Sequence, residues 1–207
     1  MGGKEATAVA VSSDGNYIIA GGEKDIAYLF DKGKTGDTYL WSVELSGEIT
    51  AVDISSDGEY AVVGAEVTSS NSRVHVFDKD SNTTLWTDLV YGDISSISIS
   101  ADSDFIAVGT VKDRIYFYDR NSDEPEWSFS TGDSVNEVSL SSDGKYLAVA
   151  MSLNPPRVAK IMIDENRLAG EIETMVNLPG TVPDGVAFAE DGDLYICLLY
   201  TSDAADE

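Results

Sequence analysis

Several residue types are nearly missing from the 207-residue chain, and each shortage excludes a kind of chemistry. There is one cysteine, Cys197, and one histidine, His75. A single cysteine cannot form a disulfide within the chain, and these two residues cannot supply the ligands of a typical zinc site. His75 lies between Val74 and Val76 in an apolar stretch, which predicts a structural place on a strand rather than a catalytic one.

Basic residues are also scarce. The 13 Lys and Arg face 37 Asp and Glu, for a net charge of −24. Phosphates would be repelled, so no nucleic-acid partner is expected. The charge fits a solvated acidic surface, solubility in high salt, or a cationic partner. No apolar run approaches the roughly 18 residues of a membrane helix, so no membrane span is expected. The sequence predicts no particular localisation.

Proline is rare and glycine frequent, which is typical of tight turns between short strands. Four similar stretches recur: VSSDGNYIIAGG, ISSDGEYAVVGA, ISADSDFIAVGT and LSSDGKYLAVAM. A weaker fifth copy is FAEDGDLYI, and successive copies lie 41 to 48 residues apart. The residues that anchor the repeat are Asp14, Asp57, Asp102, Asp143, Gly15, Gly58, Gly144, Trp41, Trp86 and Trp127.

Within each repeat the apolar pattern has the period of strands. In the second copy, ITAVDIS alternates, Asp57-Gly58 supplies a turn, and YAVVGA, RVHVFD and TTLWTDLV follow as three further strands. No stretch keeps a helical spacing over the length of a helix. Each repeat is therefore predicted to be a four-stranded antiparallel meander, which is the length and content of one β-propeller blade.

These anchors, in the order SSDGxY, aromatic-Asp and Trp, resemble the WD-repeat and quinoprotein-like β-propeller superfamily, in its archaeal-type form. The resemblance implies an all-β propeller with blades at about 7–47, 48–91, 92–132 and 133–180 and a half blade at 181–196. The three tryptophans are expected to pack between blades at equivalent places on the fourth strands, largely buried, so that Trp86→Ala costs about 3–5 kcal/mol.

The final stretch, CLLYTSDAADE (197–207), does not continue the fifth copy. It resembles the translation of a sequencing-library transposon adapter, and we interpret it as a non-native tail. Gly3 precedes Asp14 as Gly132 precedes Asp143, which suggests that the chain starts at the end of an earlier blade. We therefore expect a truncated open arc, whose first and last blades leave apolar faces uncovered and promote self-association.

Candidate sites are few. The stretch DKDSN (78–82) starts like a calcium loop, but Thr83 and Leu89 stand where an EF-hand needs Gly and Glu, so it is read as a hairpin tip. In propellers, binding residues gather on loops at one end, and the resemblance points to 65–73 and 152–157. The candidate binding residues there and nearby are Arg73, Tyr91 and Arg157.

Three functions from different classes are compatible with these features. The preferred one is a non-enzymatic scaffold that presents loops to a protein or surface partner. The FDK…LWS pattern also resembles blades of oxidoreductases that bind pyrroloquinoline quinone and calcium, and a lactonase-like hydrolase with a channel metal is the third. No catalytic, cofactor or metal residues can be assembled, so no bound cofactor is expected. Purified protein should then absorb only through its aromatic residues, and quinone with calcium should leave its melting temperature unchanged.

Overall fold

The computed structural model describes residues 5–22, 25–34, 39–152, 155–167, 169–178, 181–189 and 191–200, and within these ranges the secondary structure is entirely β. The strands form five antiparallel sheets. In chain order they are β1 (Ala6–Val11), β2 (Tyr17–Gly22), β3 (Ile26–Asp31), β4 (Tyr39–Glu44), β5 (Ile49–Ile54), β6 (Tyr60–Thr68), β7 (Asn71–Asp78), β8 (Thr84–Tyr91), β9 (Ile94–Ile99), β10 (Phe105–Thr110), β11 (Arg114–Asp119), β12 (Trp127–Ser130), β13 (Val135–Leu140), β14 (Tyr146–Met151), β15 (Arg157–Ile163), β16 (Ala169–Asn177), β17 (Thr181–Phe188) and β18 (Leu194–Tyr200).

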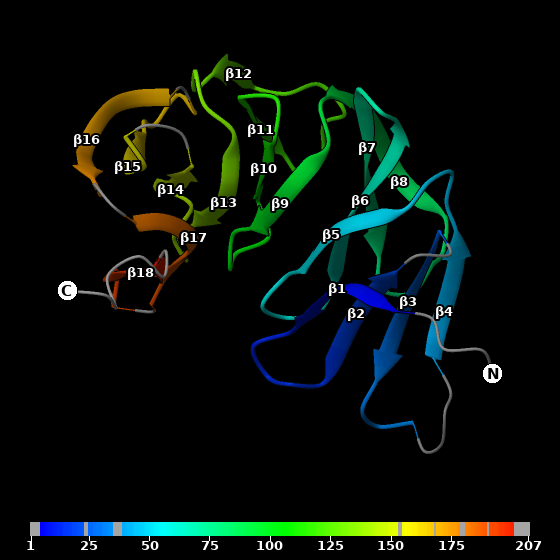
Figure 1. Ribbon diagram of the computed structural model, residues 1–207. Helices are drawn as coiled ribbons and strands as arrows, with labels where there is room; N and C mark the ends of the chain where they lie inside the picture. Colours follow the sequence, from blue (N-terminus) through cyan, green and yellow to red (C-terminus); the bar gives the residue numbers. More distant parts are fainter. Residues whose placement is uncertain are drawn as a thin grey trace.

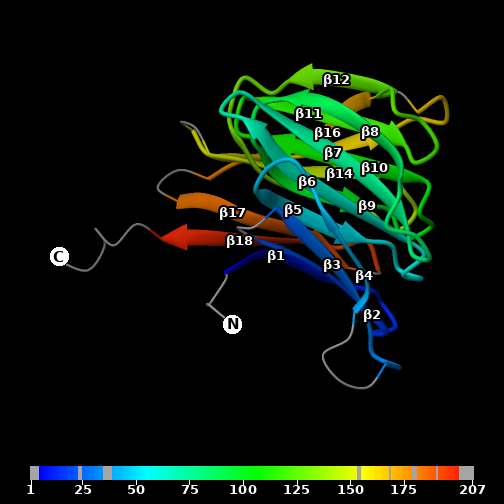
Figure 2. The same ribbon diagram turned by 90° about the vertical axis from the view of Figure 1, so that its right-hand side faces the viewer.

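The sheets are successive blades of a β-propeller. Blades 1 to 4 are meanders of four strands, β1–β4 to β13–β16, and blade 5 consists of β17 and β18. The first strand of each blade packs beside the first strand of the next, which places β1, β5, β9, β13 and β17 on the inner side of an arc (Figure 1). The fourth strands lie on the outer rim (Figures 1 and 2). The predicted fold class is confirmed.

The arc is open. Blade 5 packs on blade 4 through β13 and β14, whereas no comparable packing joins the described strands of blade 5 to those of blade 1.

The described part of the chain contains no helix of the length and hydropathy that a bilayer crossing requires.

One hydrogen-bond network holds the turn between the first two strands of blades 1 to 4. In blade 2, Ser55 Oγ donates to Asp57 Oδ1 at 2.6 Å, the Glu59 N–H donates to the same oxygen at 3.0 Å, and the Tyr60 N–H donates to Ser55 Oγ at 3.0 Å. Each contact recurs around Asp14, Asp102 and Asp143. The repeated aspartates therefore bind turn backbone and hydroxyl groups, as Asx turns do.

The residue after each of these aspartates has a positive φ; in chain order these are Gly15, Gly58, Ser103 and Gly144. A Cβ on Gly58 would lie 2.2 Å from the ring of Tyr17 in the preceding blade, and one on Gly144 would lie 2.6 Å from the ring of Phe105. Glycine is therefore favoured by backbone conformation and by close packing between blades.

The tryptophans Trp41, Trp86 and Trp127 lie on β4, β8 and β12. The indole Nε1–H of each donates to a backbone carbonyl of the following blade, at Lys79 (2.8 Å), Arg120 (2.5 Å) and Arg167 (2.8 Å). Trp41 is buried, and the other two are half-buried. Each indole therefore fastens the outer rim of one blade to the next, a role that a purely apolar side chain could not fill.

Side chains at one position of the inner strands also tie each blade to the next. They accept a backbone N–H from the neighbouring inner strand; the pairs are Asp53 with Ile99 (2.8 Å), Ser98 with Leu140 (3.0 Å) and Ser139 with Phe188 (3.3 Å). Blade 1 has Ala10 at this position, which offers no acceptor to the Ile54 N–H. Asp53 compensates, because its second oxygen accepts that N–H at 2.8 Å.

Burial raises the pKa of Asp53 to about 6, and repulsion from Glu137 adds to the effect. Because the folded-state pKa lies above the unfolded value, this carboxylate disfavours folding increasingly as the pH rises from about 4 to about 6. Asp53→Ser should therefore gain stability relative to the wild type over that window, by at most about 3 kcal/mol. Urea unfolding at pH 4 and pH 7 measures the change, with the exposed-acid variant Asp80→Asn as control.

The same variant leaves the Ile54 N–H without an acceptor, which costs about 1–3 kcal/mol at any pH. Ala10→Ser places a hydroxyl where Ser98 and Ser139 stand in blades 3 and 4. Ala10→Ser should stabilise the Asp53→Ser protein by about 1 kcal/mol more than it stabilises the wild type. Equal effects in the two backgrounds would show that Asp53 does not replace an acceptor missing from blade 1.

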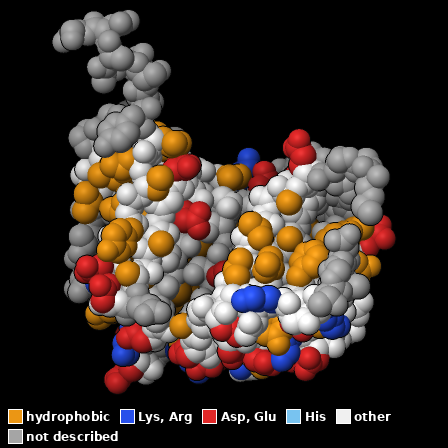
Figure 3. Space-filling view, turned by 90° about the horizontal axis from the view of Figure 1, so that it is seen from below, with side chains coloured by type: hydrophobic (Ala, Val, Ile, Leu, Met, Phe, Trp, Pro, Cys, Tyr) orange, Lys and Arg blue, Asp and Glu red, His pale blue; other side chains and the backbone are white. Residues whose placement is uncertain are grey.

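Blades 1 and 5 each expose one apolar face. Val9 and Val11 on β1 are 66% and 54% exposed, whereas the equivalent Val52 and Ile54 of blade 2 are 9% and 5% exposed. On β18, Tyr195 and Leu199 are 64% and 51% exposed and lie on the same side of the strand as the exposed Cys197. Ala187 of β17, which pairs with Tyr195, is exposed as well. Figure 3 shows apolar side chains gathered on both sides of a hollow.

The predicted non-native tail begins inside β18. Residues 197–200 pair with β17, and Cys197 lies opposite Gly185. Residues 201–207 lie outside the described residues. The strand therefore extends past the predicted boundary at residue 196, and the adapter origin of 197–207 stays a prediction.

Candidate functional site: a groove between blades 1 and 2

A groove of about 690 Å³ separates the outer parts of blades 1 and 2. We call it the blade 1–2 groove. One wall is formed by β4 and the residues after it, including Val43, Glu44 and Leu45. The other wall is formed by β7 and β8, and it presents Arg73 and His75 together with a row of hydroxyl and amide side chains, Asn82, Thr83, Thr84 and Thr87.

The alternation of β7 explains why Arg73 and His75 share this wall. Arg73, His75 and Phe77 point to one side of the strand, and Phe77 packs against Trp41 of blade 1 at a ring distance of 5.2 Å. Phe77 therefore belongs to the core between the two blades. Arg73 and His75, nearer the start of β7, line the groove.

Arg73 is a cation without a carboxylate partner among the described residues. Its Nη1 donates to Thr87 Oγ1 at a long 3.4 Å. Glu44 lies on the groove wall and is exposed, but it makes no ion pair with Arg73. In a chain with a net charge of −24, an uncompensated guanidinium in a groove stands out as a potential anion-binding group.

His75 is 8% exposed, and within the described residues neither ring nitrogen has a hydrogen-bond partner. Its ring stacks on Phe77 at 6.2 Å. Burial, reinforced by the charge of Arg73, lowers the pKa of His75 to about 4, so the imidazole is neutral at pH 7. A buried imidazole with an unsatisfied N–H is costly, and both ring nitrogens lie beneath the surface of the groove wall.

Other side chains occupy the positions equivalent to His75 in the next two blades. His75 pairs with Val63, and the matching residues are Tyr116, paired with Val108, and Ala159, paired with Val149. Between blades 2 and 3, the Tyr116 hydroxyl accepts the N–H of Tyr91 at 3.0 Å, so the phenol occupies the junction.

Between blades 3 and 4, the small Ala159 leaves a cavity of about 290 Å³. Its lining is mostly apolar, and its cation is neutralised, because Arg157 Nη2 lies 2.5 Å from Asp133 Oδ2 and donates to the Thr131 carbonyl at 3.2 Å. Among these three junctions, only the one between blades 1 and 2 combines space, a free cation and an unpaired histidine.

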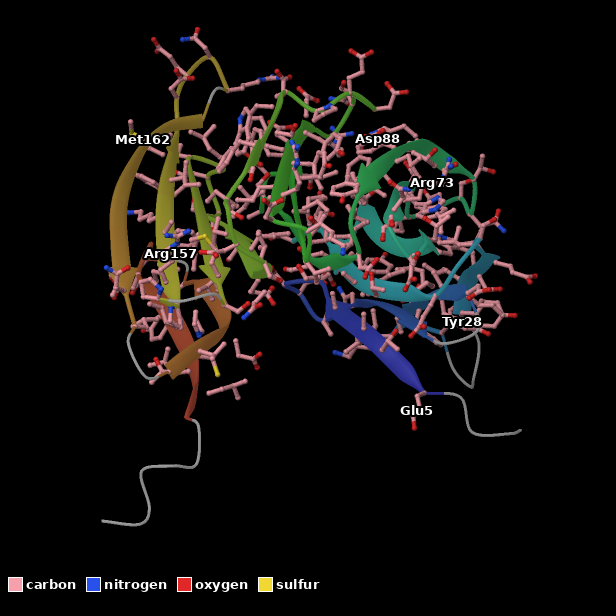
Figure 4. The ribbon with its side chains drawn as sticks, turned by 45° about the horizontal axis from the view of Figure 1, so that its top comes forward. Glu5, Tyr28, Arg73, Asp88, Arg157 and Met162 are labelled. Atoms are coloured by element: carbon pink, nitrogen blue, oxygen red, sulfur yellow. The ribbon has the colours of Figure 1, made fainter. Side chains whose placement is uncertain are left out.

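The three predicted binding residues are not gathered in one site. Arg73 lines the blade 1–2 groove, Tyr91 is half exposed at the end of β8, and Arg157 lies at the junction of blades 3 and 4; Figure 4 shows the two arginines on different blades. The predicted loop at 65–73 is wrong, because β6 continues to Thr68 and β7 starts at Asn71, forming a long hairpin. In the second loop, 153–154 lie outside the described residues.

His75 was expected to be structural, and the structure also places it on the wall of the blade 1–2 groove. The signal was present in the sequence: the third strands carry Tyr28, His75 and Tyr116 at matched positions. A histidine in a tyrosine position changes both the volume and the polarity of a junction.

The stretch 78–82 forms a hairpin tip, where the Asp80 N–H donates to Asp78 Oδ1 at 2.8 Å, and no metal-binding cluster occurs in the described part of the chain.

The blade pattern defines this protein as a β-propeller. No family model matches the chain, and no curated protein matches it. Among solved structures, it is similar to hydrazine synthase of Kuenenia stuttgartiensis (TM-score 0.74, 19% identity, 93% of this chain) and to the β-propeller domain of Cps50 (Swd1) of Myceliophteria thermophila (TM-score 0.71, 13% identity, 94% of this chain). The chain spans 61% and 66% of the length of those two chains, and at these identities the likeness shows the fold alone.

Proposed function

We propose that this chain is a non-enzymatic propeller scaffold that binds a protein partner, with the blade 1–2 groove as a contact point. The observation that carries the proposal is the pair formed by Arg73 and His75 on the wall of an open groove. Within the described residues, Arg73 has no carboxylate partner, and the buried ring nitrogens of His75 have no hydrogen-bond partner. The apolar Val43, Leu45 and Val67 beside them supply the mixed surface that is typical of peptide-binding sites.

Scaffold function fits the rest of the molecule. The turns, the tryptophans and the inner-strand acceptors all engage the protein's own backbone, which makes the blades a rigid frame. Cps50 (Swd1) has a propeller domain of similar fold, and a fold of this kind can carry many functions, binding among them. The likeness to hydrazine synthase is equally a likeness of fold, and it supplies no catalytic residue for this chain.

Selection of a random peptide display library against the purified chain tests the proposal. We expect a family of peptides to be enriched, and we expect His75→Tyr to weaken their binding at least tenfold, since Tyr116 fills the matching place in blade 3. No enrichment over the unselected library would contradict scaffold function. A rise of several degrees in melting temperature with quinone and calcium would instead favour the oxidoreductase.

A further inference from the structure

We infer that the blade 1–2 groove binds a single carboxylate of a peptide whose remaining charge is basic. The inference rests on the proposed scaffold function and specifies the ligand. Two donor groups of the groove wall carry it, the guanidinium of Arg73 and the hydroxyl of Thr87, and the unpartnered ring nitrogens of His75 are buried beside them. All three residues lie on adjacent strands, β7 and β8, where His75 pairs directly with Thr87.

The chemistry of these groups selects a carboxylate. A guanidinium binds the two oxygens of a carboxylate side by side. The neutral imidazole has one N–H to donate, and neither of its ring nitrogens has another partner in the described residues. Thr87 Oγ1 accepts from Arg73 and keeps its own hydrogen for a ligand. One carboxylate would therefore accept hydrogen bonds from Arg73 and Thr87 and neutralise an unpaired cation beside a buried, neutral imidazole.

The charge of the chain restricts what surrounds that carboxylate. A net charge of −24 repels a ligand that carries several negative charges, and Glu44 adds a negative group on the groove wall. A phosphate group has about twice the charge of a carboxylate and would face one cation only. Lysine or arginine residues flanking the carboxylate would be attracted to the acidic surface. The occupant is thus a basic peptide with one carboxylate.

The carboxylate could be the peptide's free C-terminus or an internal glutamate. Both sources offer the same group to Arg73, and Val43, Leu45 and Val67 line space for an adjoining apolar side chain. An array of lysine-rich peptides distinguishes them when each peptide is made with a C-terminal acid or amide, and with an internal Glu or Gln.

We expect the matching acid to bind the labelled chain 10- to 100-fold more tightly than its amide or Gln partner. Arg73→Ala should remove that difference, and Arg73→Lys should restore it in part. Arg114→Ala is the matched control, since Arg114 precedes Tyr116 in β11 as Arg73 precedes His75 in β7, and it should change binding less than twofold. Circular dichroism confirms that each variant is folded.

Three results would overturn the inference. Equal binding of acid and amide forms would show that the groove does not recognise a carboxylate, although peptide binding itself would still support scaffold function. Stronger competition by inorganic phosphate than by acetate would assign the groove to a phosphorylated ligand instead. Loss of binding in Arg114→Ala equal to that in Arg73→Ala would place the contact outside the blade 1–2 groove.

Discussion

Trp86→Ala should lower the free energy of unfolding by about 3–5 kcal/mol, which is a large part of the stability of an ordinary domain. The indole packs on the fully buried Tyr118 at a ring distance of 5.3 Å and donates to the Arg120 carbonyl. Alanine would remove both contacts and leave a cavity between blades 2 and 3. Trp86→Phe should cost less, because the ring contact remains and only the hydrogen bond is lost.

Leu85→Ala is the control for this prediction. Leu85 is the adjacent residue of β8, points to the other side of the strand and is 51% exposed, so its truncation should cost no more than about 0.5 kcal/mol. Chemical denaturation followed by tryptophan fluorescence and circular dichroism measures both variants. Equal costs for the two truncations would show that the tryptophan does not join the blades.

The purified chain should self-associate at micromolar concentrations. Val9 and Val11 are exposed on one face of blade 1, whereas the equivalent residues of blade 2 are covered by a neighbouring blade. Blade 5 exposes a second apolar face. Such surfaces favour association with another copy. The double variant Val9→Lys and Val11→Lys should weaken association at least tenfold, because it places two charges on the face that would be buried.

Sedimentation velocity over a range of concentrations measures this association. Leu85→Lys serves as control, because it adds a charge at an exposed position on the outer rim of blade 2, away from the exposed faces of blades 1 and 5. A wild-type chain that sediments as a monomer at every concentration over a 100-fold range, the highest included, would contradict the prediction. An equal effect of the control would show that added charge alone, and not the face of blade 1, sets the association.

Much of the fold could be predicted because its signals are local. The Asp57-Gly58 turn and the alternation of β5 lie within a few residues of one another, and they repeat in register. The role of Asp53 was not predictable in the same way. Its carboxylate compensates for Ala10 in the preceding blade and binds Ile99 in the following one, so its function depends on residues more than 40 positions away in both directions.

The candidate site was only partly predictable for the same reason. Arg73 was singled out as an arginine of a predicted binding loop, but that stretch is a hairpin. The arginine matters because His75 beside it fails to fill a junction. That failure becomes visible only when Tyr116 and Ala159 are compared with His75 in three dimensions. The empty volume between two blades depends on the side chains that face each other across the junction, and the sequence of one strand does not determine it.

The imidazole of His75 offers the most direct test of the blade 1–2 groove as a binding site. It is the only histidine of the chain, so a ¹H–¹⁵N spectrum of the ring nitrogens contains one set of signals. Addition of the basic peptide that carries the preferred carboxylate should shift these signals in step with occupancy, and Arg73→Ala should abolish the shift at the same peptide concentration. A peptide that binds the chain tightly and leaves the His75 signals unchanged would show that the groove is not where the partner binds.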